Sequence, residues 1–400
     1  MKYQFLKIIA VLFAALLLFS GCGGATSQEE PAADETTAAR EETETIPEDT
    51  SDYVYEENEV EISLLGATAQ AASDLVSISG STVTITGEGT YILSGSLDNG
   101  SVIVDAGKDE QVRLILNGVS ITSGDFAAIY VVSADEVNIT LADDTTNTLM
   151  NGGSFTAIDE SNVDAVIFSK DDITLDGNGT LIIASPAGHG IVGKDDVTVT
   201  DGSYEISASQ TAIKANDSIE ITDGSFNLTA GADGLHAENN DDDTLGAISI
   251  TGGDFYIDAA DDGIHATTTL QIDGGSFEIT AAEGLEATCI TINGGDISIA
   301  ASDDGINAAW KSSAYYPAIE INGGSITVVM GAGDTDGVDS NGDIVINGGT
   351  VNVTGNSAFD YDGTGVVNGG TVIVNGQQVA TLPNQMMGGG GGMGGPGWRP

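Results

Sequence analysis

The chain has 400 residues, of which 61 are acidic and 10 are Lys or Arg, for a formal net charge of −51. A charge this negative argues against nucleic acid and anionic membrane surfaces as partners, because both are polyanions. It also destabilises a compact fold by self-repulsion, so the composition predicts a bound cation, most simply a divalent metal ion.

The first 21 residues read as an export signal. Lys2 and Lys7 precede an apolar run over residues 8–19 that is too short to span a membrane. The sequence FSGC, which ends at Cys22, resembles a bacterial lipobox, although Phe19 stands where leucine is usual. We therefore expect lipidation of Cys22, which would place the exported protein on the extracellular face of the cell membrane with the lipid as its sole membrane contact. The alternative is an ordinary secretory signal with a chance cysteine.

Two low-complexity segments flank the body of the chain. Residues 22–58 are rich in Glu, Asp, Thr, Ala and Pro without an apolar period, which is typical of a solvated, self-repelling tether. Residues 383–400 contain GGGGGMGG and are predicted to be a disordered tail.

Residues 59–382 form a repeat with a period near 20 to 22 residues and occasional insertions. Its copies include ITGGDFYIDAADDGIHA, IDGGSFEITAAEGLEA and INGGDISIAASDDGINA. Short alternating runs separated by Gly-Gly corners indicate strands, and no run has helical spacing. We therefore predict an all-β fold, a right-handed parallel β-helix with three strands per coil, in which residues 59–172 form the first coils. The leading glycines of the clearest copies are Gly202, Gly224, Gly252, Gly274, Gly294, Gly323, Gly348 and Gly369.

Equivalent positions of successive coils lie above one another in a β-helix, so the repeat predicts stacked columns of side chains. What we call the aspartate column, at the Asp-Gly-Ile corner, reads His189, Thr211, Asp233, Asp262, Glu283, Asp304 and Asp336. What we call the histidine column, two residues past the glycine, reads Val192, Lys214, His236, His265, Glu286, Asn307, Asp339 and Asp360. Further acids, Asp261, Asp303 and Asp334, precede some corners, and Asp241–Asp243 form a second acidic cluster in an insertion.

Carboxylates stacked one rung apart repel one another by roughly 3 kcal/mol per pair. Calcium relieves this repulsion because it takes about six to eight hard oxygen ligands. We therefore predict several Ca²⁺ ions along this edge, with ligands drawn from Asp233, Asp261, Asp262, Glu283, Glu286, Asp303, Asp304, Asp334, Asp336 and Asp339. The alternative is that these aspartates bond the backbone of local turns, where Asp before Gly is common.

The insertion AAWKSSAYYP, between the copies at Gly294 and Gly323, carries aromatic residues beside these columns. Exposed aromatic rings can stack on the apolar faces of sugar rings, and histidines can contact sugar or its carboxylates. The predicted carbohydrate-binding residues are Trp310, Tyr315, Tyr316, His236 and His265. Two alternatives stay open: the loop packs its own aromatics against the body, and the histidines only soften the acidic ladder.

The segments VDAVIFSKDDITLDGNGTLII, GHGIVGKDDVTVTDGSYEI and AENNDDDTLGAISITGGDFYIDAADDGIHA resemble the carbohydrate-binding domain family of clostridial and related bacterial lipoproteins. The resemblance covers about residues 60–376. It implies a right-handed parallel β-helix similar to polysaccharide lyases, bound calcium at the Asp-Gly corners, and binding of cellulose and polygalacturonate.

Three functions follow from these observations. We favour a non-catalytic, calcium-dependent, cell-surface protein that binds a pectin-like or cellulose-like polysaccharide and is a monomer with no nucleic-acid partner. The second is a calcium-dependent pectate-type lyase with a lysine as base; of Lys194, Lys214 and Lys311, only Lys214 falls on either column. The third is a structural or adhesion protein in which calcium is a folding staple.

Overall fold

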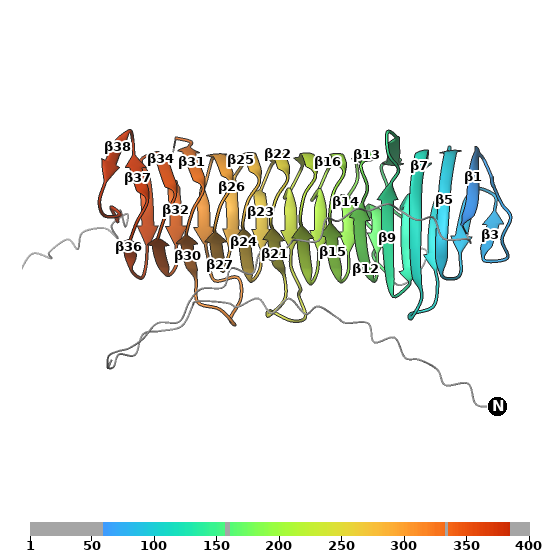
Figure 1. Ribbon diagram of the computed structural model, residues 1–400, viewed down its shortest axis with the longest axis horizontal. Helices are drawn as coiled ribbons and strands as arrows, with labels where there is room; N and C mark the ends of the chain where they lie inside the picture. Colours follow the sequence, from blue (N-terminus) through green and yellow to red (C-terminus); the bar gives the residue numbers. More distant parts are fainter. Residues whose placement is uncertain (1–58, 157–160, 333–334, 385–400) are drawn as a thin grey trace, which may run out of the picture. The chain divides into compact units, whose positions relative to one another are not determined.

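The computed structural model describes residues 59–156, 161–332 and 335–384, which all belong to one compact unit of the chain. These residues form 38 strands and no helix, in a large sheet of 25 strands and a small sheet of 13 strands. The strands follow one another around successive coils (Figure 1), and the prediction of an all-β parallel β-helix is confirmed.

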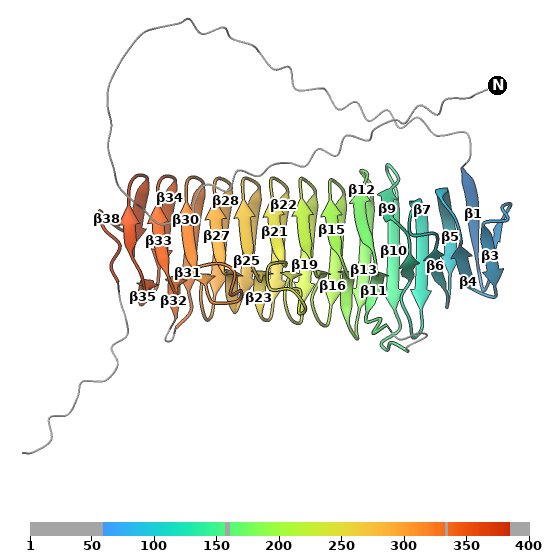
Figure 2. The ribbon, with the colours of Figure 1, turned by 90° about the horizontal axis from the view of Figure 1, so that it is seen from below.

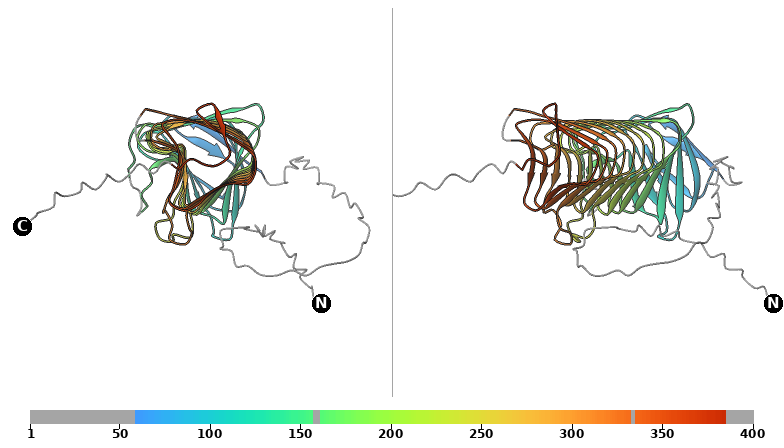
Figure 3. Two further views of the ribbon diagram at one scale, coloured as in Figure 1. Left: turned by 90° about the vertical axis from the view of Figure 1, so that its left-hand side faces the viewer. Right: turned by 60° about the vertical axis from the view of Figure 1, so that its left-hand side comes forward.

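Each regular coil contributes three strands in a constant order. The chain passes through one row of the large sheet, then the small sheet, then a second row of the large sheet. Seen end on, the strands of successive coils superimpose (Figure 3), and from below they form a regular ladder (Figure 2).

The first row of the large sheet consists of β10 (Thr146–Asn151), β13 (Thr180–Ser185), β16 (Ser203–Ala208), β19 (Ser225–Ala230), β22 (Asp254–Ala259), β25 (Ser276–Ala281), β28 (Asp296–Ala301), β31 (Ser325–Met330), β34 (Thr350–Thr354) and β37 (Thr371–Val374). The small sheet consists of β3 (Val76–Ser79), β4 (Thr82–Ile85), β6 (Ser101–Asp105), β8 (Ile129–Ser133), β11 (Ala165–Ser169), β14 (His189–Gly193), β17 (Ile213–Ala215), β20 (Leu235–Ala237), β23 (Asp262–Ala266), β26 (Glu283–Ala287), β29 (Ile306–Ala308), β32 (Asp336–Ser340) and β35 (Ser357–Tyr361). The second row of the large sheet consists of β9 (Glu136–Leu141), β12 (Asp172–Asp176), β15 (Asp196–Val199), β18 (Ser218–Ile221), β21 (Ala247–Ile250), β24 (Thr269–Ile272), β27 (Cys289–Ile292), β30 (Ala318–Ile321), β33 (Asp343–Ile346) and β36 (Gly365–Val367). The long strand β7 (Gln111–Ser123) pairs with both β9 and β10, and β1 (Val60–Gly66) and β5 (Gly89–Leu97) stack before it.

Hairpins close both ends of the stack. The strand pairs along the body are parallel, whereas β1 pairs antiparallel with β2 (Ala69–Ala71), β3 with β4, and β37 with β38 (Gln377–Val379). These hairpins cover strand edges that would otherwise pair with other chains.

Alternation along each strand builds the core. In β22, Phe255, Ile257 and Ala259 are buried while the residues between them are exposed. The ring of Phe255 stacks on the rings of Phe226 and Phe277, with centroids 4.5 Å and 4.6 Å away. A buried phenylalanine contributes roughly 2–3 kcal/mol of hydrophobic stabilisation, so an aromatic position that recurs in four successive coils adds substantially to the stack.

The Gly-Gly corners are dictated by backbone geometry. The second glycine of one corner, Gly275, has a φ of +98°, and a Cβ there would lie 2.8 Å from the Gly253 carbonyl oxygen of the preceding coil. A residue with a side chain would be both strained and crowded at this position.

The polar residue before each Gly-Gly pair forms a ladder of its own. The Nδ2 group of Asn293 donates to Asp273 (2.6 Å), and Asn322, Asn347 and Asn368 each donate to the asparagine of the coil before (2.8 Å each). These side-chain bonds hold adjacent corners in register in addition to the backbone bonds.

Several predictions fall on parts of the chain that the structure leaves undescribed. The signal peptide, Cys22, the tether and residues 385–400 of the tail lie outside the described residues. In the part that is described, no helix has the length and apolar character needed to cross a membrane.

Candidate functional site

Both predicted columns lie along the small sheet, and its registers confirm their alignment. In the aspartate column Asp262 pairs with Glu283 on the next coil. In the histidine column His265 pairs with Glu286, which pairs with Asn307. Glycine is required at the corner between Asp262 and Ile264, because a Cβ on Gly263 would lie 2.5 Å from the Gly284 carbonyl oxygen.

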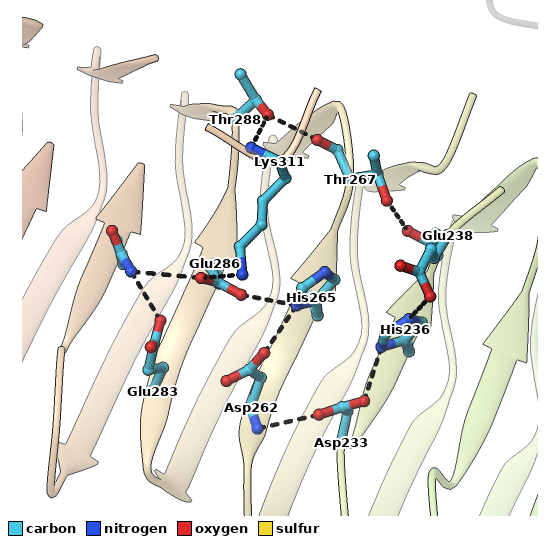
Figure 4. A network of polar contacts seen from close by, with 12 residues as sticks. Asp233, His236, Glu238, Asp262, His265, Thr267, Glu283, Glu286, Thr288 and Lys311 are labelled. Carbon is cyan, nitrogen blue, oxygen red and sulfur yellow. Dashed lines mark hydrogen bonds and ion pairs between the residues drawn. The ribbon is translucent and has the colours of Figure 1, made fainter. Parts of the chain in front are cut away.

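The centre of the site is a buried charge cluster around Glu286 (Figure 4). Nδ1 of His265 lies 2.8 Å from Oδ2 of Asp262 and 2.8 Å from Oε2 of Glu286. Nζ of Lys311 lies 2.7 Å from the other oxygen of Glu286, Oε1. Two bases and two acids from three successive coils therefore neutralise one another.

The pKa values in this cluster follow from its contacts. Burial lowers the pKa of His265, but its hydrogen bonds to Asp262 and Glu286 outweigh burial and raise it to about 9. Burial raises the pKa of Glu286, but the hydrogen bonds and charges of His265 and Lys311 hold it well below its usual range. At neutral pH we therefore expect a cationic imidazole held by an ionised Glu286.

One coil upstream, the same arrangement recurs in simpler form. Nδ1 of His236 lies 2.7 Å from Oδ2 of Asp233, and Nε2 lies 3.3 Å from Glu238. The two imidazole rings of His236 and His265 stack with centroids 4.5 Å apart. Burial raises the pKa of Asp233, and the hydrogen bond from His236 more than offsets this and lowers it.

Downstream of Glu286, the column positions that the structure describes hold several acids and no Lys, Arg or His. Burial, then the charges of Asp303 and Asp336, raise the pKa of Asp304 to about 6. Burial, then the charges of Asp304, Asp336 and Asp360, raise the pKa of Asp339 to about 7. Burial, followed by the charges of Glu286 and Asp262, also raises the pKa of Glu283. This half of the site has a deficit of positive charge.

The predicted backbone role of the corner aspartates is present as well. Oδ1 of Asp233 accepts a hydrogen bond from the backbone N–H of Asp262 (3.2 Å), and Oδ1 of Asp304 accepts one from Asp336 (3.1 Å). Each of these carboxylates therefore bonds the next coil with one oxygen and leaves the other for a base or a metal ion.

Two sets of residues have the chemistry to hold a metal ion. Asp262, His265 and Glu286 offer ligand atoms within 4.8 Å of one another, but His265 and Lys311 already supply positive charge there. The second set, which we call the downstream acid set, offers only oxygens: Glu283, Asp304, Asp336, Asp339 and the buried amide of Asn307. Asn307 donates through Nδ2 to Glu283 (2.9 Å), while its Oδ1 has no hydrogen-bond partner within the described residues. Such a donor set suits Ca²⁺, although its carboxylates lie farther apart than those of the first set.

The remaining predicted ligands lie at the edge of the site. Asp261 and Asp303 are exposed, and Asp334 lies outside the described residues. Lys214 lies in β17, paired with Val192 on one side and with His236 on the other.

The aromatic insertion, residues 309–317, forms a wall beside the cluster. Trp310 is 57% exposed and Tyr316 is 45% exposed, and their rings meet edge to face with centroids 5.5 Å apart, whereas Tyr315 is half-buried. His265, by contrast, is 9% exposed and engaged by two carboxylates, which leaves it little surface to offer a sugar.

The sequence gives no direct sign of the contact that holds this insertion. Asp243, in the insertion over residues 238–246, accepts hydrogen bonds from the backbone N–H (3.0 Å) and hydroxyl (2.6 Å) of Ser313. Its backbone carbonyl accepts one from the hydroxyl of Ser312 (2.5 Å). The buried hydroxyl of Thr288 accepts the backbone N–H of Ser312 (2.9 Å). The sequence feature that could have predicted this contact is that both insertions interrupt the repeat at the same corner.

Comparison with known proteins shows that these coils are similar to carbohydrate-binding domain-containing proteins. A family model described as carbohydrate-binding domain-containing protein matches residues 79–337. A carbohydrate-binding domain-containing protein of Acetivibrio thermocellus is 37% identical over 137 residues, which are 34% of this chain and 48% of that protein. This chain thus spans about half the length of the curated relative it matches.

A solved structure also matches part of this chain. The polysaccharide lyase-like protein from C. thermocellum, solved as a gadolinium derivative, is 24% identical and matches with a TM-score of 0.38. The match covers 80% of this chain and 96% of that one. A likeness of this size says nothing about the site.

Proposed function

The chain belongs to the family of carbohydrate-binding domain-containing proteins, and from that premise we propose that it binds polysaccharide along its small sheet without cleaving it. The family match over residues 79–337 includes the coils that carry the charge cluster and the aromatic wall. The ligand we propose is a pectin-like or cellulose-like glycan, held at the outer surface of a cell by a lipid on Cys22.

The single observation that carries the non-catalytic part is the pairing of the bases beside Glu286. A β-elimination needs a base that can take a proton from the sugar at neutral pH. Lys311 and His265 both lie within 2.8 Å of Glu286, and these contacts raise the pKa of each base. Both therefore hold their protons, which speaks against either of these two groups as the base of a lyase.

We propose Ca²⁺ at the downstream acid set. Burial first, and then the charges of neighbouring acids, raise the pKa values of Asp304 and Asp339. A divalent cation would relieve the repulsion between these acids, and the free amide oxygen of Asn307 adds a neutral ligand. When bound, the ion would supply positive charge for a sugar carboxylate or hydroxyl, and Trp310 would offer a ring face for stacking.

A binding assay with a product assay tests these roles. The full chain is incubated with polygalacturonate or a neutral β-glucan in calcium, and retention by the polymer and ultraviolet absorbance of unsaturated product are recorded. We expect retention without new absorbance, and a clear loss of retention for Trp310→Ala. Growing absorbance would establish a lyase, and absence of retention on both polymers would leave the structural role, with calcium as a staple.

A further inference from the structure

His265 lies between two carboxylates that meet at the same ring nitrogen. Nδ1 of His265 is 2.8 Å from Oδ2 of Asp262 on its own strand and 2.8 Å from Oε2 of Glu286 on the next coil (Figure 4). A ring nitrogen carries one hydrogen, and that hydrogen can point fully at only one of the two oxygens. Three ligand atoms therefore converge on a position that a single proton serves incompletely.

This convergence is confined to one place in the described part of the chain. Among the residues that the structure describes, Asp262, His265 and Glu286 are the one set of three His, Cys, Asp or Glu side chains whose ligand atoms all lie within 4.8 Å of one another. All three side chains are buried, so the surrounding coils hold the ligand atoms in place.

The preceding coil carries a matched histidine that lacks this convergence. The ring of His236 stacks on that of His265, with centroids 4.5 Å apart and an interplanar angle of 8°. The two carboxylates near His236 lie at different nitrogens: Asp233 is 2.7 Å from Nδ1 and Glu238 is 3.3 Å from Nε2. Each nitrogen of His236 thus has one partner, and no single ion could bind one of these nitrogens and both carboxylates. The stacked ring of His236 instead limits rotation of His265.

The spacing of the three ligand atoms suits a tetrahedral transition-metal ion. Zn²⁺ takes nitrogen and oxygen ligands at about 2.0–2.2 Å, which places the ligand atoms of a tetrahedron about 3.3–3.5 Å apart. The two 2.8 Å separations at Nδ1 of His265 would widen by roughly half an ångström to admit the ion. Small rotations of the two carboxylates supply this change.

The same position is a poor one for calcium. Ca²⁺ takes about six to eight oxygen ligands, whereas two carboxylates and a nitrogen meet here. The ammonium group of Lys311 also lies 2.7 Å from Oε1 of Glu286, which prevents this carboxylate from binding an ion with both oxygens. The Asp262 corner therefore differs in chemistry from the all-oxygen downstream acid set.

We propose that Asp262, His265 and Glu286 bind a zinc-class divalent ion that joins the coils of β23 and β26. The ion takes the place of the Nδ1 proton of His265, which passes to solvent, and a water molecule completes the tetrahedron. Lys311 holds the other oxygen of Glu286 and so directs Oε2 toward the ion. This site is separate from the calcium proposed downstream and does not depend on which glycan is bound.

The test compares zinc with calcium on the full chain without an affinity tag, after a chelator has removed bound metal. Calorimetry measures the binding of ZnCl₂ and CaCl₂, and the visible absorption of the chain loaded with Co²⁺ reports its coordination. The variants are His265→Gln, the matched His236→Gln, and Asp304→Asn/Asp339→Asn, which removes two carboxylates of the downstream acid set.

We expect a tight Zn²⁺ site from which calcium does not displace the ion, and the intense visible bands of four-coordinate Co²⁺. His265→Gln should weaken zinc binding by more than about 100-fold, whereas His236→Gln, which removes only the stacked neighbour, should cost no more than about tenfold. Asp304→Asn/Asp339→Asn should keep the wild-type affinity for zinc.

Absence of zinc binding, calcium binding of equal affinity at this site, or equal losses in the two histidine variants would overturn the proposal. A sulfur-to-cobalt charge-transfer band would place the ion on a cysteine and overturn it as well. If His265→Gln does not fold, the wild-type cobalt spectrum decides, because the weak bands of six-coordinate Co²⁺ would exclude the proposed tetrahedron. Loss of the zinc site alone would leave the proposed function and its calcium site standing.

Discussion

Glu286 divides the site into two electrostatic halves. On its upstream side each carboxylate of the two columns meets an imidazole or an ammonium group, at Asp233, Asp262 and Glu286 itself. On its downstream side Asp304 and Asp339 face other acids. The two halves of the site thus differ in charge balance. Imidazole and ammonium groups of the protein neutralise the acids of the upstream half, whereas Asp304 and Asp339 in the downstream half lie among other acids.

Removing the charge of Glu286 tests how much its ion pairs with His265 and Lys311 stabilise the fold. Glu286→Gln would leave His265 and Lys311 without their shared partner in a buried setting, so we expect the free energy of unfolding to fall by about 3 kcal/mol. Urea denaturation measures this change. Glu278→Gln, an exposed glutamate on β25, serves as the matched control and should cost less than about 0.5 kcal/mol. Equal effects of the two substitutions would contradict the role given to Glu286.

The stability that the downstream acids contribute should depend on pH. The folded-state pKa of Asp339 is raised to about 7, so its contribution to stability is full below the unfolded pKa near 4 and is lost as the pH rises through 7. In the Asp339→Asn variant, the asparagine that replaces this carboxyl does not titrate. In chelator, we therefore expect the stability of this variant relative to the wild type to rise from pH 5 to pH 8 by roughly 1–2 kcal/mol, after a discount for solvent screening. Denaturation at the two pH values checks this, and a pH-independent difference would argue against it.

Two inserted loops act together at the scale of the elements. The segments 238–246 and 309–317 lie 70 residues apart at the Asp243–Ser313 contact, yet they meet outside the two intervening coils. The second loop carries Lys311 into the charge cluster and presents Trp310 to solvent. The contact between the two loops therefore positions both the ammonium group of Lys311 and the indole ring of Trp310.

Breaking this contact should loosen the aromatic wall. In a Trp398→Phe background, which leaves Trp310 as the sole tryptophan, Asp243→Ala should increase iodide quenching of the Trp310 fluorescence. Asp241→Ala, in the same loop, is the control, because its backbone N–H rather than its carboxylate makes the recorded bond. Identical quenching in all three proteins would show that the loop contact does not position Trp310.

At the scale of the whole molecule, the chain carries a net charge of −51. Stacking spreads the acids over many coils, but it also places like charges one above another at the corners. The Asn ladder and the Gly-Gly corners supply neutral stacking at one edge, while the small sheet concentrates both the acids and the few bases. Cation binding should consequently affect the stability of the whole stack.

Calcium should raise the melting temperature of the full chain. A ligand present at 100 times its Kd stabilises the folded state by ~2.7 kcal/mol, so we expect a shift of several degrees between chelator and excess Ca²⁺. The shift should largely disappear in Asp304→Asn/Asp339→Asn and persist in the control Asp254→Asn, an exposed acid on β22. A melting temperature that does not respond to calcium would contradict the proposed metal site.

The sequence by itself determined the period, the corners and the two columns. The period of INGG-type corners predicts coils, and because parallel strands stack in register, residues such as His236 and His265 had to lie one above the other. Local chemistry sufficed for this, since each coil repeats the same glycines and the same alternation.

Only the tertiary structure decided which acid meets which base. Lys311 and Asp243 lie in insertions that break the period, so no alignment of repeats could place Nζ of Lys311 on Glu286 or Asp243 on Ser313. The repeat assigned all the corner acids the same role, as candidate metal ligands, whereas the path of one loop neutralises Glu286 and leaves Asp304 and Asp339 in need of a cation. The physical reason is that a column of like charges is periodic, while the charges that balance it arrive on loops that are not.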